Sequence, residues 1–210
     1  MFSFTNPSHI RRAVCASFAI AALSAFALPA AHAQSYPNKP IKFVVPFSAG
    51  SATDSVGRIV AQAMSDAWGQ PITIENKAGA NGILGAESVK AAPADGYTFL
   101  VTTSTTQAAN VHLYRKLPYD PVKDFAPIGK IGEVGFILMV ANDFPAKDMK
   151  EFVSYAKAHP GKLAYGHGSS GSLVSAAMLT ELAGLQTVGV PYKSIPPALT
   201  DLLGGQIQFA

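Results

Sequence analysis

Hydrophobic and polar residues follow two different periods along this chain, and the two periods alternate. Short apolar runs rich in β-branched and aromatic residues predict strands, whereas apolar residues three or four positions apart predict helices. The strand candidates are residues 41–45, 72–74, 97–101, 128–131, 136–140, 163–165, 187–192 and 206–210. The helix candidates are residues 53–68, 82–90, 148–159, 170–183 and 198–203. This alternation predicts an α/β fold built on parallel or mixed sheets.

Three of the predicted helices carry an apolar stripe that we expect to face a core. The stripe of helix 53–68 consists of Val56, Ile59, Val60, Ala63, Met64 and Ala67. Helix 148–159 presents Met149, Phe152, Val153 and Ala156. Helix 170–183 is expected to bury Leu173, Val174, Ala177, Met178 and Leu182. Residues 113–127, which are rich in Pro and Asp, read as a connecting stretch.

The N-terminal segment, residues 1–33, has the pattern of a secretory signal peptide. Arg11 and Arg12 form a charged start, residues 13–28 are apolar, and small residues occupy the cleavage positions up to Ala33. A transmembrane anchor is the alternative, but the apolar run is slightly short to span a bilayer. We expect cleavage after Ala33 and export to the periplasm.

Composition and charge narrow the class of protein. The 210 residues are 49% hydrophobic and 14% charged, which provides enough apolar material for a core and excludes intrinsic disorder. The net charge of +3 falls to +1 once Arg11 and Arg12 are removed, because 14 basic residues then face 13 acidic ones. A near-neutral chain without basic runs is a poor nucleic-acid binder. The single cysteine, Cys15, excludes a disulfide scaffold, a thiolate zinc cage and an iron–sulfur cluster.

Three segments share one form, in which a strand is followed by small polar residues and then by a helix start. They are the first loop (residues 46–54), the second loop (76–82) and the third loop (166–172). Free backbone N–H groups at a helix start, together with the helix dipole, attract anions. Ordinary helix caps and tight turns have the same composition. A carboxylate or phosphate pocket and plain capping therefore stay open as alternatives.

The third loop also allows two enzymatic interpretations. Residues 166–171 match G-x-G-x-x-G, but the next strand ends in Pro191-Tyr192-Lys193 without the acidic residue that a dinucleotide site needs. An exported serine-type hydrolase using His167 with Ser169 or Ser170 is the other alternative, although no orienting acid can be placed. The histidines have no metal-like spacing, and we expect no metal and no cofactor.

Ordered sequence blocks extend over residues 36–210. They are YPxKPI at 36–41, VPF at 45–47, TD at 53–54, ENKAGANG at 75–82, ADGYT at 94–98, LPYDPVKDF at 117–125, YG at 165–166, SSG at 169–171, VPYK at 190–193 and ALTDLLGGQ at 198–206. In this the chain resembles the Bug-type (TctC-like) solute-binding receptors of the tripartite tricarboxylate transporter family.

The resemblance implies a type 2 periplasmic-binding-protein-like α/β fold, with two lobes of mixed β-sheet and flanking helices. The first lobe would take residues 34–133 and the second residues 134–210. The implied function is that of a monomeric, non-enzymatic receptor for a small organic carboxylate, such as a di- or tricarboxylate, an amino acid or an aromatic acid. The ligand would be delivered to membrane permease subunits or to a sensor.

Family members hold the ligand carboxyl through backbone amides, hydroxyls and waters, which the resemblance carries over to positions in the three loops and after strand 97–101. The ligand-binding candidates are Ser48, Ala49, Gly50, Ser51, Ala52, Thr53, Asp54, Asn81, Gly82, Ser104, Thr105, Thr106, Gly168, Ser169, Ser170, Gly171 and Ser172. Thr53 and Asp54 fit equally well as N-cap and first-turn residues that orient the first loop.

The chain departs from the family pattern at three places. The usual glycine pair of the first loop is replaced by residues 49–52, and Ser194 stands where a glycine is usual. Family members also continue for about a hundred residues beyond position 210, roughly the chain of one lobe. On this ground we expect the first lobe to be incomplete and to expose strand edges and apolar surface. A truncated, non-functional fragment is the remaining alternative.

Overall fold

The computed structural model describes residues 35–210, and the predicted signal peptide lies outside the described residues. The first sheet contains β1 (Ile41–Val45), β2 (Ile72–Asn76) and β3 (Thr98–Leu100) in the order β2-β1-β3. Both ladders are parallel, with Ile41 opposite Ile72 and Lys42 opposite Thr98. Because consecutive parallel strands need a crossover, each connection carries a helix.

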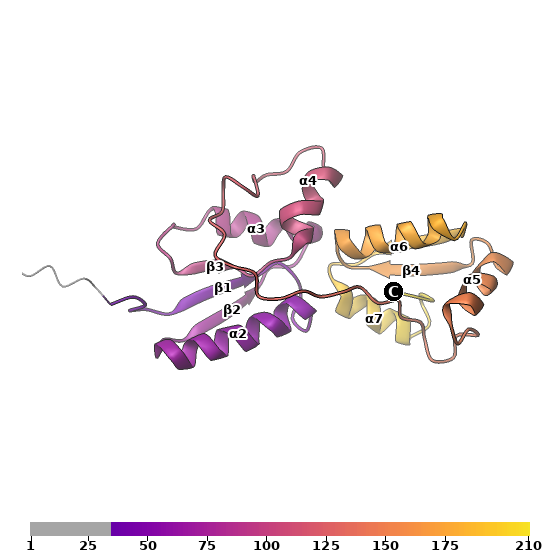
Figure 1. Cartoon of the computed structure of the whole chain (residues 1–210), viewed down its shortest axis with the longest axis horizontal. Helices are drawn as coiled ribbons and strands as arrows, with labels where there is room; N and C mark the ends of the chain where they lie inside the picture. The colour runs from indigo at the N-terminus through magenta and orange to yellow at the C-terminus, as the bar shows by residue number, and fades with distance from the viewer. Residues whose placement is uncertain (1–34) are drawn as a thin grey trace, which may run out of the picture. The chain divides into compact units, whose positions relative to one another are not determined.

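The helices α2 (Ala52–Trp68) and α3 (Ile83–Lys90) make these crossovers and lie on opposite sides of the first sheet (Figure 1). α2 packs through Gly57, Ala61 and their neighbours, since a side chain at Gly57 would lie 3.4 Å from Val101 and 3.5 Å from Val45. The core beneath α2 combines apolar residues of β1 with those of α2 and β3. Its buried members are Ile41, Phe43, Val45, Phe47, Ala61 and Val101.

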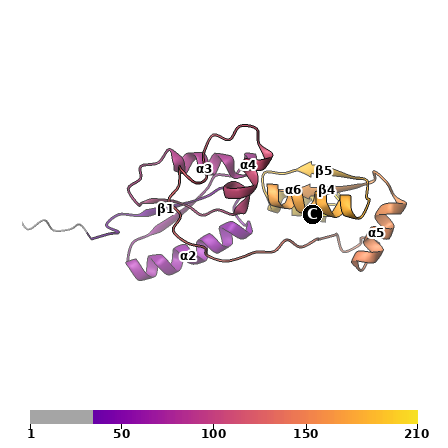
Figure 2. The ribbon, with the colours of Figure 1, turned by 45° about the horizontal axis from the view of Figure 1, so that its top comes forward.

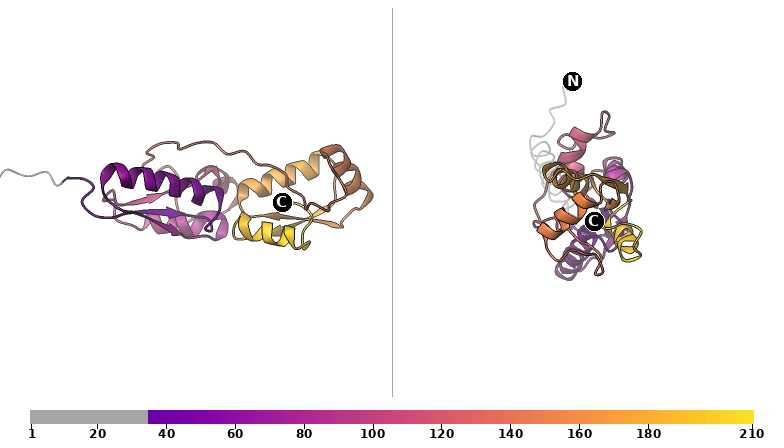
Figure 3. Two further views of the ribbon diagram at one scale, coloured as in Figure 1. Left: turned by 90° about the horizontal axis from the view of Figure 1, so that it is seen from below. Right: turned by 90° about the vertical axis from the view of Figure 1, so that its right-hand side faces the viewer.

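The second sheet pairs β4 (Leu163–His167) with β5 (Thr187–Pro191) in parallel, Leu163 opposite Thr187. The helices around it are α5 (Met149–Ala158), α6 (Ser170–Leu182) and α7 (Ile195–Leu203). Figures 1 and 3 show α6 and α7 on opposite sides of this sheet, and Figure 2 shows β4 and β5 side by side. Phe209 bridges the backbone of both Val140 and Tyr165. The buried cluster on the α5 and α6 side consists of Phe152, Ala156, Leu163, Tyr165 and Phe209.

The strand–helix order agrees with the α/β prediction, but three strand candidates are wrong. Residues 128–131 and 136–140 contain no strand, and only Val140 makes an isolated bridge. Residues 206–210 likewise contribute only the bridges of Phe209. A strand needs a neighbouring edge, and residues 126–139 pair with no strand of the described chain. The apolar side chains of residues 128–137 are consequently exposed, with Ile137 at 75%, whereas Leu138 and Met139 pack against the buried clusters around the second sheet.

All three predicted apolar stripes are also partly wrong. Ile59 on α2 is 70% exposed, Met149 on α5 is 50% exposed, and Leu182 on α6 is 83% exposed. α2 turns the predicted Val60 and Met64 to the sheet together with Ala61, because the small residues at 57 and 61 allow close approach. α6 has apolar residues on all sides, so periodicity does not select its packed face. That face consists of Ala176 and Leu179.

Candidate functional site

The carboxyl ends of the parallel strands bring the candidate residues of the first sheet to one edge. β1, β2 and β3 run in the same direction, so the first loop, the second loop and residues 101–106 all follow that edge. Asn76 Nδ2 donates to the Phe47 carbonyl at 3.0 Å, which ties the first loop to the end of β2. In open α/β sheets this edge is where ligands bind.

The first loop is organised by Ser51 and Asp54. Ser51, not Thr53, is the N-cap of α2, and its hydroxyl accepts the Asp54 amide at 3.2 Å. Asp54 is 3% exposed and accepts from the Gly50 amide and from Arg58 Nε. Asn76 Nδ2 donates to its other oxygen. With its oxygens occupied in this way, Asp54 is placed to orient the loop, which is the second of its two expected roles.

Ionisation of Asp54 reflects the balance of these contacts. Burial opposes the charged form, but the hydrogen bonds from Arg58, Gly50 and Asn76 outweigh it. The pKa of Asp54 therefore lies below its ordinary value. A carboxylate in the first turn also interacts favourably with the dipole of α2.

The second loop follows a backbone path that favours glycine. Gly79, Ala80, Asn81 and Gly82 all have positive φ, from 48° at Ala80 to 137° at Gly79. A side chain at Gly82 would lie 2.4 Å from Thr106 Cγ2, so this close approach requires glycine. Gly82 and Thr106 are thus brought together.

The segment after β3 forms a π-helical turn, η2 (Thr105–Ala109), and a short helix, α4 (Asn110–Leu113). Thr106 is fully buried, and its carbonyl accepts a 2.6 Å hydrogen bond from Tyr119 Oη. Thr105 is buried as well, whereas Ser104 is exposed. Among these three candidates, only Ser104 offers its side chain to solvent.

The third loop repeats the organisation of the first. Ser169 is the N-cap of α6, and Ser172 completes a capping box with it. The Ser172 hydroxyl accepts the amides of Gly168 and Ser169, each at 3.1 Å. The buried Ser170 hydroxyl donates to Asn110 Oδ1 at 2.8 Å. A side chain at Gly168 would collide with the Ser194 backbone at 2.1 Å, so this position requires glycine.

Within residues 35–210, the capping bonds leave the same two amides of both helices without an acceptor. A helix start has four N–H groups without an intrahelical acceptor. In α2 and α6 the N-cap amide and the third helical amide are bonded to loop atoms or side chains. The remaining donors are the amides of Ala52 and Thr53 in α2, and those of Ser170 and Gly171 in α6.

His167 is half-buried, and this burial lowers its pKa. Within residues 35–210 its ring makes no hydrogen bond to Ser169 or Ser170, whose hydroxyls bond to Ser172 and Asn110. The described residues also contain no group of His, Cys, Asp or Glu side chains that could hold a metal ion. Nor does any helix in this part of the chain have the length and apolar character to cross a membrane.

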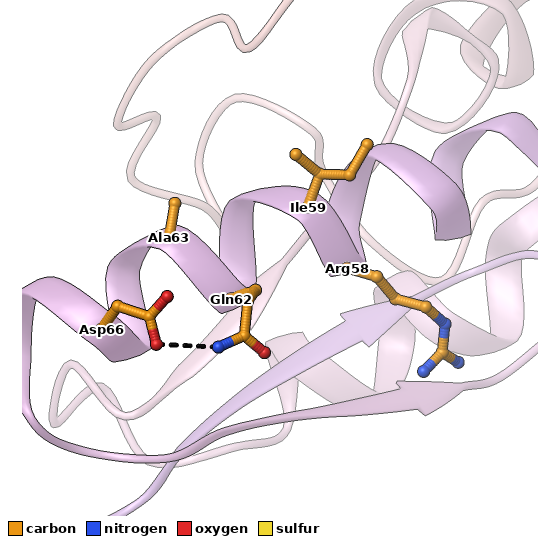
Figure 4. A pocket seen from close by; sticks show the side chains of 5 residues that line it. All are labelled: Arg58, Ile59, Gln62, Ala63 and Asp66. Atoms are coloured by element: carbon orange, nitrogen blue, oxygen red, sulfur yellow. Dashed lines mark hydrogen bonds between the residues drawn. The ribbon is translucent and has the colours of Figure 1, made fainter.

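An open hollow of about 450 Å³ lies on the outer surface of α2 (Figure 4). Its lining consists of Arg58, Ile59, Gln62, Ala63 and Asp66. Gln62 Nε2 donates to Asp66 at 2.8 Å across it. None of the predicted site residues lines this hollow, so it is separate from the three loops.

One residue that connects the loops is not among those predicted from the sequence. Asn110 is fully buried and bonds to the Asn81 carbonyl as well as to Ser170. It lies in a segment without strong periodicity, and its partners are 29 and 60 positions away in the sequence. No local pattern carries that information.

Comparison with known proteins gives a family. The profile described as tripartite tricarboxylate transporter family receptor (TctC) matches residues 56–210. Protein BugT of Bordetella pertussis is 35% identical over 180 residues, covering 83% of this chain and 55% of BugT. A Cupriavidus necator protein, described as the UPF0065 protein in the gbd 5′ region, is 40% identical over 199 residues, covering 90% of this chain and 58% of that protein.

Solved structures agree with the sequence relatives. R. palustris Rpa4515 with adipate has a TM-score of 0.81 and 35% identity, covering 83% of this chain and 59% of that one. MatC from Rhodopseudomonas palustris with bound malate has a TM-score of 0.76 and 39% identity, covering 83% and 60%. A third, the periplasmic binding protein BugD, has a TM-score of 0.72 and 32% identity, with 83% and 58% covered.

These similarities confirm the periplasmic-binding-protein-like α/β fold. The relatives are described as receptors and periplasmic binding proteins, which favours the receptor interpretation over the hydrolase alternative. The chain spans somewhat more than half the length of the relatives it matches. With a family profile over residues 56–210 and relatives above 30% identity, the chain belongs to the TctC receptor family of the tripartite tricarboxylate transporters.

Proposed function

We propose that the chain acts as an exported receptor that binds a small organic carboxylate and presents it to tripartite tricarboxylate transporter permease subunits. The observation that carries this proposal is the matched pair of helix starts, each with two amides that lack an intrahelical acceptor behind a small polar loop. Such amides, with the helix dipole, suit a carboxylate oxygen. A dicarboxylate can use both helix starts at once.

The ligand class is drawn from the relatives as well as from the loops. One solved relative holds adipate and another holds malate, both small dicarboxylates. We therefore propose a dicarboxylate as the first ligand to test, ahead of amino acids and aromatic acids. In this arrangement residues 34–133 and 134–210 form the two lobes, residues 1–33 are removed on export to the periplasm, and the receptor acts as a monomer.

Within the proposed site, backbone amides replace most of the predicted hydroxyls as donors. The hydroxyls of Ser51, Ser169 and Ser172 cap helices, and that of Ser170 bonds to Asn110. Ser48 and Ser104 keep hydroxyls that are at least partly exposed. The small side chains of Ala49 and Gly50 leave room for a ligand to approach the backbone. At Gly171 the ring of Phe136 occupies this space, since an added Cβ would lie 2.5 Å from Phe136 Cζ.

The test is calorimetric titration of the full chain with adipate, malate, citrate, aspartate and benzoate. In a thermal melt, a ligand at a hundredfold its dissociation constant adds about 2.7 kcal/mol of stability. For a chain of this size that corresponds to a shift of several degrees, at about 2–4 °C per kcal/mol. If no member of the panel binds, the proposed function is wrong.

A proline substitution tests the amide donors directly. Ala52 is the first residue of α2, where proline is tolerated, and the preceding Ser51 is already extended at ψ 158°. Ala52→Pro should remove one donor and weaken binding by about tenfold or more, as for a hydrogen bond to a charged group. Met149→Pro is the matched control, because it removes the equivalent amide from α5 after the extended Asp148. Equal affinities of the two variants would contradict the amide site.

A further inference from the structure

We propose that Asn110 is a positioning residue, which holds the N-terminus of α6 against the second loop and so sets the spacing of the carboxylate site. This inference rests on the proposed function. It assigns a role to a side chain that touches no ligand. Asn110 is fully buried, and its amide group reaches both Asn81 and Ser170.

The hydrogen bonds of Asn110 fix the orientation of its amide group. Nδ2 donates to the Asn81 carbonyl at 3.0 Å, and Oδ1 accepts from the Ser170 hydroxyl at 2.8 Å. Rotating the amide by 180° would bring its oxygen against the Asn81 carbonyl, which has no proton to donate. Only an amide side chain supplies a donor and an acceptor at these two places.

The two partners of Asn110 belong to different parts of the candidate site. Asn81 lies in the second loop with φ 52°, a conformation that non-glycine residues adopt at a cost. Its side chain is held by Tyr114 Oη at 2.6 Å, while its carbonyl is held by Asn110. Ser170 is the first residue of α6 and precedes Gly171.

The hydroxyl and the backbone amide of Ser170 have different roles. The side chain is fully buried, and its hydroxyl is already bonded to Asn110, so the hydroxyl is placed to anchor α6 and not to bind a ligand. The backbone amide of Ser170 lies at the helix start without an intrahelical acceptor, but the whole residue is 0% exposed, so this amide is buried as well. Ser170 therefore contributes to the site through its position, which Asn110 determines.

A fixed spacing matters because a small ligand gains affinity from donors that are already in place. Groups that must be ordered on binding reduce the net free energy of association. Without Asn110, the first turn of α6 loses its side-chain connection to the second loop. The expected consequence is a wider range of distances between α2 and α6 and a weaker complex.

The experiment uses the full chain with Cys15→Ser as background, and compares Asn110→Ala, Ser170→Ala, the double variant and the control Tyr192→Phe. The control removes the 2.6 Å hydrogen bond from Tyr192 Oη to Asp201, which lies between β5 and α7 and involves neither Asn110 nor Ser170. Spin labels at the exposed positions Gln62 and Ser175 report the distance between α2 and α6. Adipate and malate are the binding probes.

We expect the label distances to broaden in Asn110→Ala and in Ser170→Ala and to stay narrow in Tyr192→Phe. Affinity for the probe that binds should fall by about fivefold to tenfold in each of the first two variants, as for one lost hydrogen bond. Because both act on one connection, the double variant should bind no more weakly than Asn110→Ala alone. General destabilisation would also affect Tyr192→Phe.

Unchanged label distances in the two folded variants would overturn the proposal, and so would broadened distances with unchanged affinity. If Asn110→Ala does not fold, Ser170→Ala alone tests the proposal. It removes the hydrogen bond between Ser170 and Asn110 but leaves the one between Asn110 and Asn81. If neither probe binds the unmodified chain, the dicarboxylate ligand is wrong, and the remaining members of the panel decide the carboxylate function. The label distances then still decide whether Asn110 positions α6.

Discussion

Arg58 Nε donates a 3.0 Å hydrogen bond to Oδ2 of Asp54, one turn earlier on α2. The same carboxylate accepts the Gly50 amide at 2.9 Å and Asn76 Nδ2 at 2.9 Å. One buried acid thus connects the helix, the first loop and the end of β2. The shape of the first loop depends on this connection more than on any hydroxyl in the loop.

Replacement of Asp54 by asparagine should destabilise the fold. One side of the new amide group would present N–H where Asp54 accepts a hydrogen bond, so a buried donor would face another donor. We expect a loss of about 1–3 kcal/mol in the free energy of unfolding. Chemical denaturation at pH 7 measures it. Asp66→Asn on the exposed surface of α2 is the control and should change stability by less than about 0.5 kcal/mol.

The pH dependence of stability, compared between the unmodified chain and Asp54→Asn, gives a second prediction. Since the pKa of Asp54 is lowered in the fold, its stabilising effect is fully present above its ordinary value of 3.8. The effect is lost as the pH falls through the lowered pKa, because the folded chain must then take up the proton. The difference in the free energy of unfolding between the unmodified chain and Asp54→Asn should therefore shrink as the pH falls below 3.8. A difference that stays constant down to pH 2 would contradict the charge-based account.

The lowered pKa of His167 affects stability in the same direction as that of Asp54, but at higher pH. Burial lowers its pKa, so between that value and the ordinary 6.5 the unfolded chain binds more protons than the folded one. Stability should then decline as the pH falls below 6.5. His167→Gln should flatten this part of the stability profile, measured by urea unfolding from pH 7.5 to 5. The control, His112→Gln, replaces an exposed histidine of α4 and should keep the slope of the parent.

The close approach of the second loop to η2 makes Gly82 a sensitive position. Ala at this site would adopt φ 82° and bring Cβ to 2.4 Å from Thr106 and 3.2 Å from Pro46. Overpacking costs about 1–3 kcal/mol in addition to the backbone strain. Gly69→Ala isolates the strain, since Gly69 has φ 65° and no atom within 4 Å of the added carbon. Equal losses in thermal melts of the two variants would show that the predicted clash is relieved by local movement.

The sequence predicted the elements whose signal is local and missed those that depend on distant partners. β1 and α2 follow from short-range periodicity, and the caps Ser51 and Ser169 come from loops that were recognised as helix starts. Residues 128–140 have the composition of strands, but a strand forms only against a suitable edge. The π-helical turn at Thr105–Ala109 has no distinct sequence signature.

The candidate site shows the same limit at the level of single atoms. Composition identified the loops correctly as helix starts rich in small polar residues. It could not show that the hydroxyls of Ser169, Ser170 and Ser172 are used within the protein. Hydrogen-bond partners such as Asn110 lie dozens of positions away and become visible only when the chain is folded.

Phe209, rather than the apolar surface of α6, should carry the stability of the second sheet. Its side chain is fully buried, and its ring lies 5.2 Å from that of Phe152 and 5.3 Å from that of Tyr165. Phe209→Ala should cost about 3–5 kcal/mol, because it removes buried surface and leaves a cavity. Leu182→Ala is the matched truncation on α6, and at 83% exposure it should cost less than about 0.5 kcal/mol. Denaturant unfolding compares the two. A loss of more than 2 kcal/mol in Leu182→Ala, on the order of a buried truncation, would mean that the apolar side of α6 is covered in solution, as its sequence pattern first predicted.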